Sequence, residues 1–196
     1  MNDKLLNGAT IFLFFLGVGC IIYVLFDSYS QESEFDKLGN VSCVKSTDII
    51  VSNDATMAGL IELNARVKVY RGYYGCNMVE RGDMVLFQFS KSIPPVVRII
   101  YGLPGDKFKL TKNAADQWRI DINGTVVSGS AGEYTIASNS IPPLKTYEIS
   151  RRGVLKENEY ILFADQSPAI SDSSNLGIIT KDKIVGKALL HIEDAG

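Results

Sequence analysis

Arg98-Ile-Ile-Tyr-Gly-Leu-Pro-Gly-Asp106 is the stretch around which the rest of this sequence is organised. It begins as an apolar, β-branched run, which is typical of a buried strand. The run ends at Gly102-Leu-Pro-Gly105, where proline fixes φ and glycine permits a positive φ. The pattern therefore predicts a buried strand that stops in a tight turn.

The chain around this stretch predicts further strands, because it holds several β-branched and aromatic segments bounded by turn residues. The dipeptide Asn123-Gly124 favours a type I′ turn between two of them. No other long stretch beyond residue 40 has the 3.6-residue period of a helix. We therefore predict one all-β, mainly antiparallel domain over residues 41–196, with residues 128–152 as an excursion. The predicted strands are Asp48–Val51, Arg66–Tyr70, Met84–Phe89, Val96–Ile100, Trp118–Ile122, Thr125–Val127, Tyr160–Phe163 and Lys183–Ile192.

Composition excludes several classes of function. The net charge of −2 over 196 residues, without a run of Lys or Arg, argues against a nucleic-acid partner. The chain has 1 histidine, His191, so a catalytic triad or a histidine-rich metal site would have to use that residue. We interpret His191 as a strand residue. No glycine-rich phosphate loop is visible, and we expect neither a metal nor a cofactor.

Residues 9–26 form an apolar run that predicts one transmembrane helix. At about 1.5 Å per residue a helix of this length covers roughly 27 Å, which is enough for a hydrocarbon core. A cleavable signal peptide fits less well, because no small-x-small site follows Phe26. Cleavage before Cys20 fits less well still, since the apolar run continues past it. The lipid bilayer is thus an expected partner.

Charge around the apolar run predicts its orientation. Lys4 precedes the run, whereas Asp27 and further acidic residues follow it. Positive charge favours the cytoplasm. We therefore expect a single-pass protein of the cytoplasmic (inner) membrane, with residues 1–8 as a cytoplasmic tail, residues 27–40 as a tether and the β domain outside, in the periplasm. A disulfide between Cys43 and Cys76 is chemically permitted there, but the sequence leaves it open.

Four segments in order resemble the successive motifs of type I signal peptidases and of the maturation peptidases of conjugal transfer systems. Beside residues 98–106 these are Asp54-Ala-Thr-Met-Ala-Gly-Leu60, Arg81-Gly-Asp-Met-Val-Leu-Phe87, and Tyr160-Ile-Leu-Phe-Ala-Asp165 followed by Asp172-Ser173. The resemblance covers residues 48–188. It implies the family's β fold and a signal peptide, or the N-terminus of an exported precursor, as the binding partner. Secretion or conjugation machinery is implied as a further partner.

The chain departs from the family's pattern at the positions that carry the chemistry. Thr56 stands where the family has its serine nucleophile, and Arg98 stands where it has the lysine that acts as general base. Gly59 replaces the usual proline, and Ser174 replaces an expected arginine. The family's Gly-Asp-Asn-Arg sequence reads Ala-Asp-Gln-Ser at residues 164–167.

A Ser-Lys hydrolase needs a lysine whose pKa burial lowers until the neutral amine is populated. Thr56 keeps a hydroxyl, although its methyl group crowds the path of attack. Neutralising the Arg98 guanidinium at pH 7 would cost about 7 kcal/mol, which offsets most of what a general base contributes. Arg98 could instead hold a carboxylate, for which we expect Asp165 or Asp172, or donate to backbone carbonyls. Lys68 and Lys91 are less favoured substitutes for the base.

The resemblance also implies supporting and substrate-binding residues. Asp165, Asp172 and Ser173 would support the site. An extended peptide would add to the edge of a sheet, with Asp48–Ala55 and the region of Met84–Phe89 as edge strands and Met57 dipping toward the bilayer. The implied substrate-binding residues are Ile50, Val51, Ala55, Met57, Met84 and Leu86.

Two functions follow from this pattern. The first is a degenerate homologue that binds precursor N-termini without cleaving them. The alternative is an active serine-type endopeptidase with Thr56 as its nucleophile. The self-cleaving repressors that share this fold are disfavoured, because they carry a DNA-binding domain in place of an apolar anchor. We expect an inactive wild type and some activity in a variant that combines Thr56→Ser with Arg98→Lys.

Overall fold

The computed structural model describes residues 38–137 and 141–190. The chain divides into two units, Met1–Val41 and Ser42–Gly196, and the fold below is that of the second unit. The predicted tail and anchor, with most of the predicted tether, lie outside the described residues. Within the described ranges no helix is both long enough and apolar enough to cross a membrane.

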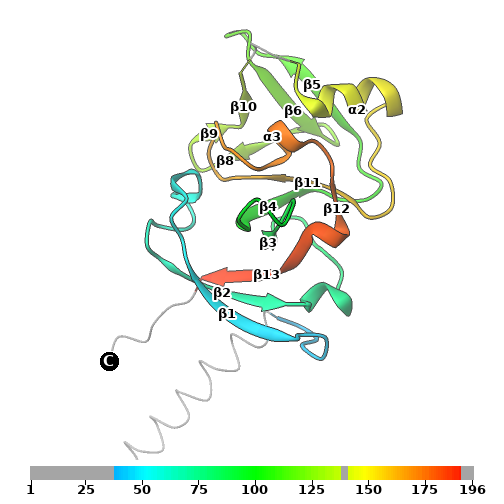
Figure 1. The fold of residues 1–196 in the computed structure, drawn as a ribbon. Coiled ribbons are helices and arrows are strands. Elements are labelled where there is room, and N and C mark those ends of the chain that lie inside the picture. Colours follow the sequence, from blue (N-terminus) through cyan, green and yellow to red (C-terminus); the bar gives the residue numbers. More distant parts are fainter. Residues whose placement is uncertain (1–37, 138–140, 191–196) are drawn as a thin grey trace, which may run out of the picture. The chain divides into compact units, whose positions relative to one another are not determined.

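The main element of the unit is a seven-stranded sheet in which neighbouring strands run antiparallel (Figure 1). Its central strand is β3, which pairs with β13 on one side and with β4 on the other. In spatial order the strands are β1 (Ser46–Val51), β2 (Arg66–Arg71), β13 (Ile184–Leu190), β3 (Met84–Phe87), β4 (Val96–Gly102), β11 (Glu159–Phe163) and β12 (Ile179–Thr180).

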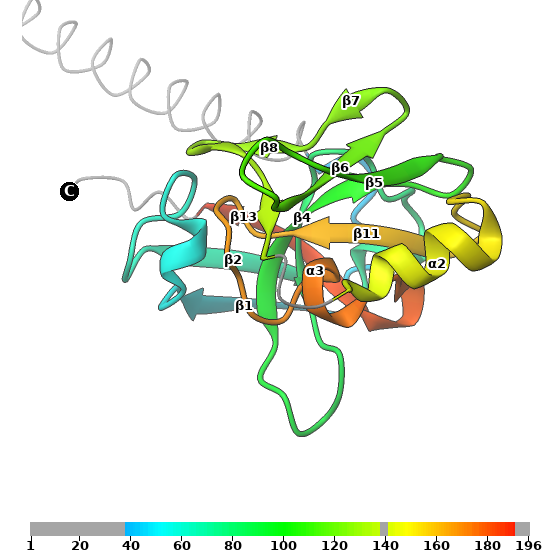
Figure 2. The same cartoon turned by 90° about the horizontal axis from the view of Figure 1, so that it is seen from above.

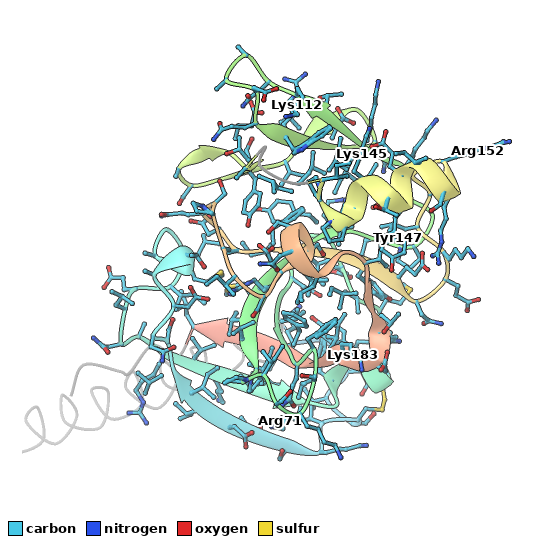
Figure 3. The ribbon with its side chains drawn as sticks, turned by 45° about the horizontal axis from the view of Figure 1, so that its top comes forward. Arg71, Lys112, Lys145, Tyr147, Arg152 and Lys183 are labelled. Atoms are coloured by element: carbon cyan, nitrogen blue, oxygen red, sulfur yellow. A yellow bond between two sulfur atoms is a disulfide. The ribbon has the colours of Figure 1, made fainter. Side chains whose placement is uncertain are left out.

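A smaller sheet and a helix lie at the far end of the unit from β1 (Figures 1 and 2). The helix α2 (Pro143–Arg151) lies against β5. The Nζ atoms of Lys112 in β5 and Lys145 in α2 lie 4.7 and 5.6 Å from the centroid of the Trp118 ring. Both lysines are labelled in Figure 3. The strands of this sheet are β10 (Thr135–Ile136), β6 (Trp118–Ile122) and β5 (Phe108–Lys112), with β7 (Thr125–Val126) paired to β6.

Short elements connect the strands. A two-stranded hairpin of β8 (Ser128–Gly129) and β9 (Gly132–Glu133) follows β7. One short α-helix, α3 (Ser173–Leu176), follows β11. The 3₁₀ turns are η1 (Ala55–Met57), η2 (Tyr73–Gly75) and η3 (Lys181–Lys183).

Two hydrophobic clusters hold the elements together. One lies among the strands of the large sheet and the loop after η1, and includes Met57, Ile61 and Leu86. The other lies between the small sheet, α2 and β11, and includes Phe108 and Phe163. Their side chains leave water almost completely, which is the main stabilising term of a domain of this size.

The predicted all-β, mainly antiparallel class is confirmed, and so are the strands that carry the strongest patterns. The turn after β4 forms as expected, with Gly105 at φ 88°. The hairpin at Asn123-Gly124 also forms, with φ values of 53° and 86° that suit a type I′ turn. The excursion at residues 128–152 contains structure that the sequence pattern did not predict, namely β8, β9, β10 and α2.

One strand assignment was wrong. The region of Met84–Phe89 was expected at a sheet edge, but β3 lies in the middle of the large sheet. Its apolar side chains already indicated burial, because strands covered on both faces read as continuous hydrophobic runs. Among the described strands, the edge strands of this sheet are instead β1 and β12, and the beginning of β4 pairs with β3 alone.

Two ion pairs connect the sequence motifs to one another. Arg81 donates from Nη2 to both carboxylate oxygens of Asp106, at 3.0 and 2.8 Å. Lys187 of β13 donates to Asp83 at 2.7 Å, and the hydroxyl of Tyr74 donates to the other oxygen of Asp83 at 2.8 Å. The segment Arg81-Gly-Asp83 is thus joined by ion pairs to the turn after β4 and to β13.

Cys43 and Cys76 form a disulfide, with their Cα atoms 5.7 Å apart. Cys43 precedes β1, and Cys76 directly follows η2. The bridge therefore joins the chain before β1 to the loop after β2, and it resolves the pairing that the sequence left open.

Candidate functional site

Thr56 lies in η1, the short turn that follows β1. Asp54 caps this turn, because its carboxylate oxygen Oδ1 accepts from the Thr56 backbone N–H at 2.9 Å. The Thr56 hydroxyl donates to the same oxygen at 2.6 Å. The Thr56 hydroxyl, at the position where the pattern of the family has its nucleophile, therefore already donates its hydrogen bond to the Asp54 carboxylate.

Arg98 lies in β4 with only 1% of its surface exposed. Its Nη1 donates to Oδ2 of Asp54 at 2.7 Å and to the carbonyl of Val97 at 2.6 Å. Its Nη2 donates to the carbonyl of Ile170 at 2.6 Å. The guanidinium thus joins three segments: β4, the start of η1 and the loop before α3.

Asp54 is the residue that connects Arg98 to Thr56, since each of its two oxygens accepts from one of them. Burial would raise the pKa of the Asp54 carboxyl, but hydrogen bonds from Thr56 and Arg98 and the positive charge of Arg98 outweigh it. The net result is a pKa below its ordinary value of 3.8. A carboxylate whose pKa is lowered is a weaker base than an ordinary one, and therefore a poorer acceptor for the threonine proton.

Two lysines were considered as substitutes for the base. The Nζ atom of Lys68 lies over the ring of Tyr70, 5.4 Å from its centroid. Lys91 is exposed in the loop between β3 and β4, which extends away from the sheet (Figure 2). These placements give no support to either lysine as the base.

Arg98 was expected to pair with Asp165 or Asp172, and this prediction was wrong. Its ion pair is with Asp54. The Asp54 carboxylate follows β1, and β1 is far from β4 in the order of the sheet. The contact shows that the chain after β1 comes back beside the beginning of β4, which no local pattern could indicate.

Asp165 lies close to the same turn but binds a different partner. Its oxygens accept from the backbone N–H of Ser130, at 2.9 Å, and from the Ser130 hydroxyl. The next residue, Gln166, donates its backbone N–H to the carbonyl of Thr56 at 2.8 Å. Ser130 is a residue of the site that sequence reasoning missed, because it lies in the excursion and belongs to no motif.

Asp172 and Ser173 hold the segment around α3. Asp172 is fully buried and caps α3, accepting from the backbone N–H and the hydroxyl of Ser174 and from the hydroxyl of Tyr134. Burial raises the pKa of Asp172 despite these hydrogen bonds. Ser173 accepts from the backbone N–H of Leu162 at 2.9 Å. Asp172 thus accepts from the hydroxyl groups of Ser174 and Tyr134. The pattern of the family has an arginine at the position of Ser174.

The expected substrate-binding residues divide into two groups. Val51 is 60% exposed at the end of β1, Ala55 is also exposed, and Ile50 is partly buried. Met84 is partly buried within the large sheet. Met57 and Leu86 lie in the core, with 1% and 0% of their surface exposed, so neither side chain is at a surface that a peptide could reach. The expectation that Met57 points outward to a bilayer is thus wrong for this structure.

Two open strand edges meet near Thr56. Among the described strands, the outer edge of β1 carries no partner. β11 pairs with β4 only from Ile99 to Gly102, so residues 96–98 pair with β3 alone. Because Arg98 contacts Asp54, these two edges lie on either side of the same turn. An extended peptide could pair with the backbone of either edge.

A pocket of about 580 Å³ includes Leu60, which follows the turn, in its lining. Its lining is mainly apolar, and Leu60 and Ser128 form the part nearest to η1 and to the β8–β9 hairpin. The remaining lining residues are Arg81, Gly82, Ile99, Ile100, Tyr101, Ile122, Asn123, Thr125, Val126 and Val127.

This fold and its motifs match a known family. The model of the family described as signal peptidase, peptidase S26, matches residues 39–192. The chain belongs to this family. Among solved structures, the signal peptidase I of Enterococcus faecalis V583 is similar to this S26 chain at 20% sequence identity and a TM-score of 0.39; the match covers 57% of this chain and 97% of that chain. Comparison with curated proteins gives no match.

Proposed function

We propose that this protein is a membrane-anchored member of the signal peptidase family that binds the N-termini of exported or conjugative precursors without cleaving them. Membership of the family supports a signal peptide as the ligand. The absence of cleavage is proposed from the arrangement around Thr56.

One observation carries the proposal: the buried guanidinium of Arg98 occupies the position of the general base. A lysine there can lose its proton when burial lowers its pKa, but a guanidinium stays charged. Arg98 is also fixed by the carboxylate of Asp54 and two backbone carbonyls. Asp54, which accepts the hydrogen bond of the Thr56 hydroxyl, is itself a weak base because its pKa is lowered.

Peptide binding is supported by the two open strand edges on either side of η1. A peptide in extended conformation would pair its backbone with β1, and the exposed end of β1 near Val51 would meet its side chains. Main-chain pairing of this kind requires no catalytic group. Binding can therefore persist in a chain that has lost the reaction.

The disulfide supports the proposed location. Disulfides persist where the surroundings are oxidising, as in the bacterial periplasm, and Cys43–Cys76 lies within the β domain. Together with the apolar run at residues 9–26, this favours an extracytoplasmic domain held at the inner membrane. Contacts with secretion or conjugation machinery would follow from that position.

The alternative is an active endopeptidase with Thr56 as nucleophile. Its only supporting observation is the hydrogen bond from the Thr56 hydroxyl to Asp54, which has the geometry of a nucleophile and its base. The lowered pKa of Asp54 opposes this reading.

A cleavage assay separates the two functions. The full-length protein in detergent is incubated with a precursor that bears a signal peptide, and the products are identified by mass. We expect no product from the wild type. Measurable cleavage that disappears in Thr56→Ala would establish the active enzyme and overturn the proposal.

The structure changes the design of the gain-of-function variant. In the pair Thr56→Ser and Arg98→Lys, the carboxylate of Asp54 would lie beside the new amine and hold it in its charged form. We therefore expect little activity from that pair and more from a triple variant that adds Asp54→Ala. The matched control is the triple variant with Thr56→Ala in place of Thr56→Ser, which should stay inactive.

Binding is measured separately, with a fluorescent, non-cleaved signal peptide and the wild type in detergent. Saturable binding without turnover is the expected result. If the peptide does not bind at any concentration tested, the proposed function fails.

A further inference from the structure

Two groups attach the β8–β9 hairpin to the site: the carboxylate of Asp165, and the hydroxyl of Tyr101, which donates to the carbonyl of Ser128 at 3.1 Å. Ser130 lies at its tip, between β8 and β9, and both its backbone N–H and its hydroxyl donate to Asp165. Asp165 is 3% exposed, and Ser130 itself is exposed. A buried carboxylate that accepts two hydrogen bonds from one residue fixes that residue firmly, because charged acceptors make the stronger hydrogen bonds.

Two glycines permit the close approach of the hairpin. A Cβ atom at Gly59 would overlap the Ser130 side chain and the Asp165 carboxylate. A Cβ atom at Gly129 would overlap the backbone carbonyl of Asp165. Neither glycine has a positive φ, so the space, and not the backbone conformation, requires glycine here. This accounts for Gly59 at a position where the family's pattern has proline.

Gln166 connects Asp165 to Thr56. Gln166 follows Asp165 and donates its backbone N–H to the carbonyl of Thr56. The hairpin, Asp165, Gln166 and η1 are thus linked by consecutive contacts. Any movement of Asp165 would be passed to the turn that carries Thr56.

We propose that Ser130 is a positioning residue of the peptide-binding site. Together with Asp165 and Gly59, it holds the β8–β9 hairpin against the turn that carries Thr56, and we call this arrangement the latch. The latched hairpin forms one wall of the site beside η1. Its release loosens η1 and lets a bound peptide dissociate faster. This inference rests on the proposed function for its ligand, but the latch itself is a property of the free protein.

The first test is hydrogen exchange on the free full-length protein in detergent. Ser130→Ala should raise the exchange rates of amides in residues 129–132 about tenfold, the effect of one charge-assisted hydrogen bond. Amides of residues 55–61 should exchange faster as well, through Gln166. Amides of β3 should not change. Ser150→Ala, which changes an exposed serine of α2 outside the site, is the matched control and should leave all of these rates unchanged.

The second test is a double-variant cycle on the same readout. Gly59→Ala should release the hairpin as strongly as Ser130→Ala, because the added methyl group displaces Ser130. Combining Gly59→Ala with Ser130→Gly should be less disruptive than the sum of Gly59→Ala and Ser130→Gly measured singly. The double variant lacks the Ser130 side chain, one of the two groups that the new methyl group would overlap, and only the overlap with the Asp165 carboxylate remains. Additive effects would show that the two residues do not act on each other and would overturn the latch.

The third test uses the fluorescent signal peptide. Ser130→Ala should raise its dissociation rate at least threefold, while Ser150→Ala leaves it at the wild-type value. If residues 55–61 keep their exchange rates in Ser130→Ala, or if peptide dissociation does not change, Ser130 is not a positioning residue. Failure of the wild type to bind any peptide would instead refute the proposed function, and the exchange experiments would still decide whether the latch exists.

Discussion

Arg98 stands where the pattern of the family has a lysine, and the two kinds of side chain differ in what burial does to them. Burial lowers the pKa of a lysine and can make it a base, whereas a guanidinium stays protonated and must be given acceptors. Asp54 and the carbonyls of Val97 and Ile170 supply those acceptors. The Arg98 side chain therefore cross-links segments of the fold.

The contacts of Arg98 should contribute to the stability of the fold. Arg98→Ala should lower the free energy of unfolding by about 3–5 kcal/mol, because it leaves Asp54 without its buried partner and opens a cavity. Arg98→Lys keeps the charge but cannot reach all three acceptors, and should cost about 1–3 kcal/mol. Urea unfolding in detergent measures both. Lys91→Ala, in an exposed loop, serves as the control and should stay within about 0.5 kcal/mol of wild type. Equal stability of Arg98→Ala and wild type would contradict the cross-link.

Asp54 should make stability depend on pH in the acid range. Because the pKa of its carboxyl is lowered in the folded protein, its contribution is present above about pH 3.8 and is lost as the pH falls through the folded value. Asp54→Asn removes that contribution. We therefore expect its Tm to lie below that of wild type at pH 6, and the difference to shrink as the pH is lowered below about 4. A difference that stays constant down to pH 2 would show that the Asp54 charge does not stabilise the fold.

At the scale of elements, the sequence predicted what a local pattern can encode. Three local patterns each predict a strand or a turn by themselves, and each predicted element is found. They are the alternation in Arg66–Tyr70, the apolar run before Gly102 and the turn at Asn123-Gly124. The helix α2 was missed because only one of its residues, Leu144, is buried. A helix with so narrow an apolar face gives no 3.6-residue period.

Besides the buried side chain of Leu144, polar contacts hold α2 in place, and their contribution can be tested. Glu148 accepts from the backbone N–H of Leu110 at 2.9 Å, and Lys145 donates to the carbonyl of Leu110 at 3.1 Å and to Glu148 at 2.9 Å. The pair therefore satisfies both backbone groups of a residue on the edge strand β5. Such pairing protects an edge that would otherwise be open to another strand.

Glu148→Ala should destabilise the protein by about 1–3 kcal/mol, because it leaves the N–H of buried Leu110 without an acceptor. The Leu110 amide should also lose its protection from hydrogen exchange. Glu157→Ala, an exposed glutamate in the loop before β11, is the matched control and should change neither quantity. If the Leu110 amide remains protected in Glu148→Ala, the carboxylate is not its essential partner.

At the scale of the whole molecule, the site is assembled from contacts that sequence reading could only partly anticipate. The motifs identified Thr56 and Arg98, but the contact between them depends on Asp54, 44 residues from Arg98 along the chain. Ser130 and Asp165 are 35 residues apart. Partners at such separations are set by the packing of strands and not by any local pattern, which is why Arg98 was assigned the wrong carboxylate and Ser130 was missed.

The disulfide acts at this same scale, because it closes a loop between residues 33 positions apart, Cys43 and Cys76. Constraining a loop of this length in the unfolded chain stabilises the folded state by about 3–4 kcal/mol. Urea unfolding with and without dithiothreitol should therefore give a lower midpoint for the reduced wild type. A variant with Cys43→Ser and Cys76→Ser should have the midpoint of the reduced wild type, and dithiothreitol should not change it. The midpoint of Cys20→Ser should fall on reduction as that of the wild type does. A wild type whose midpoint does not change on full reduction would show that the bridge does not stabilise the β domain.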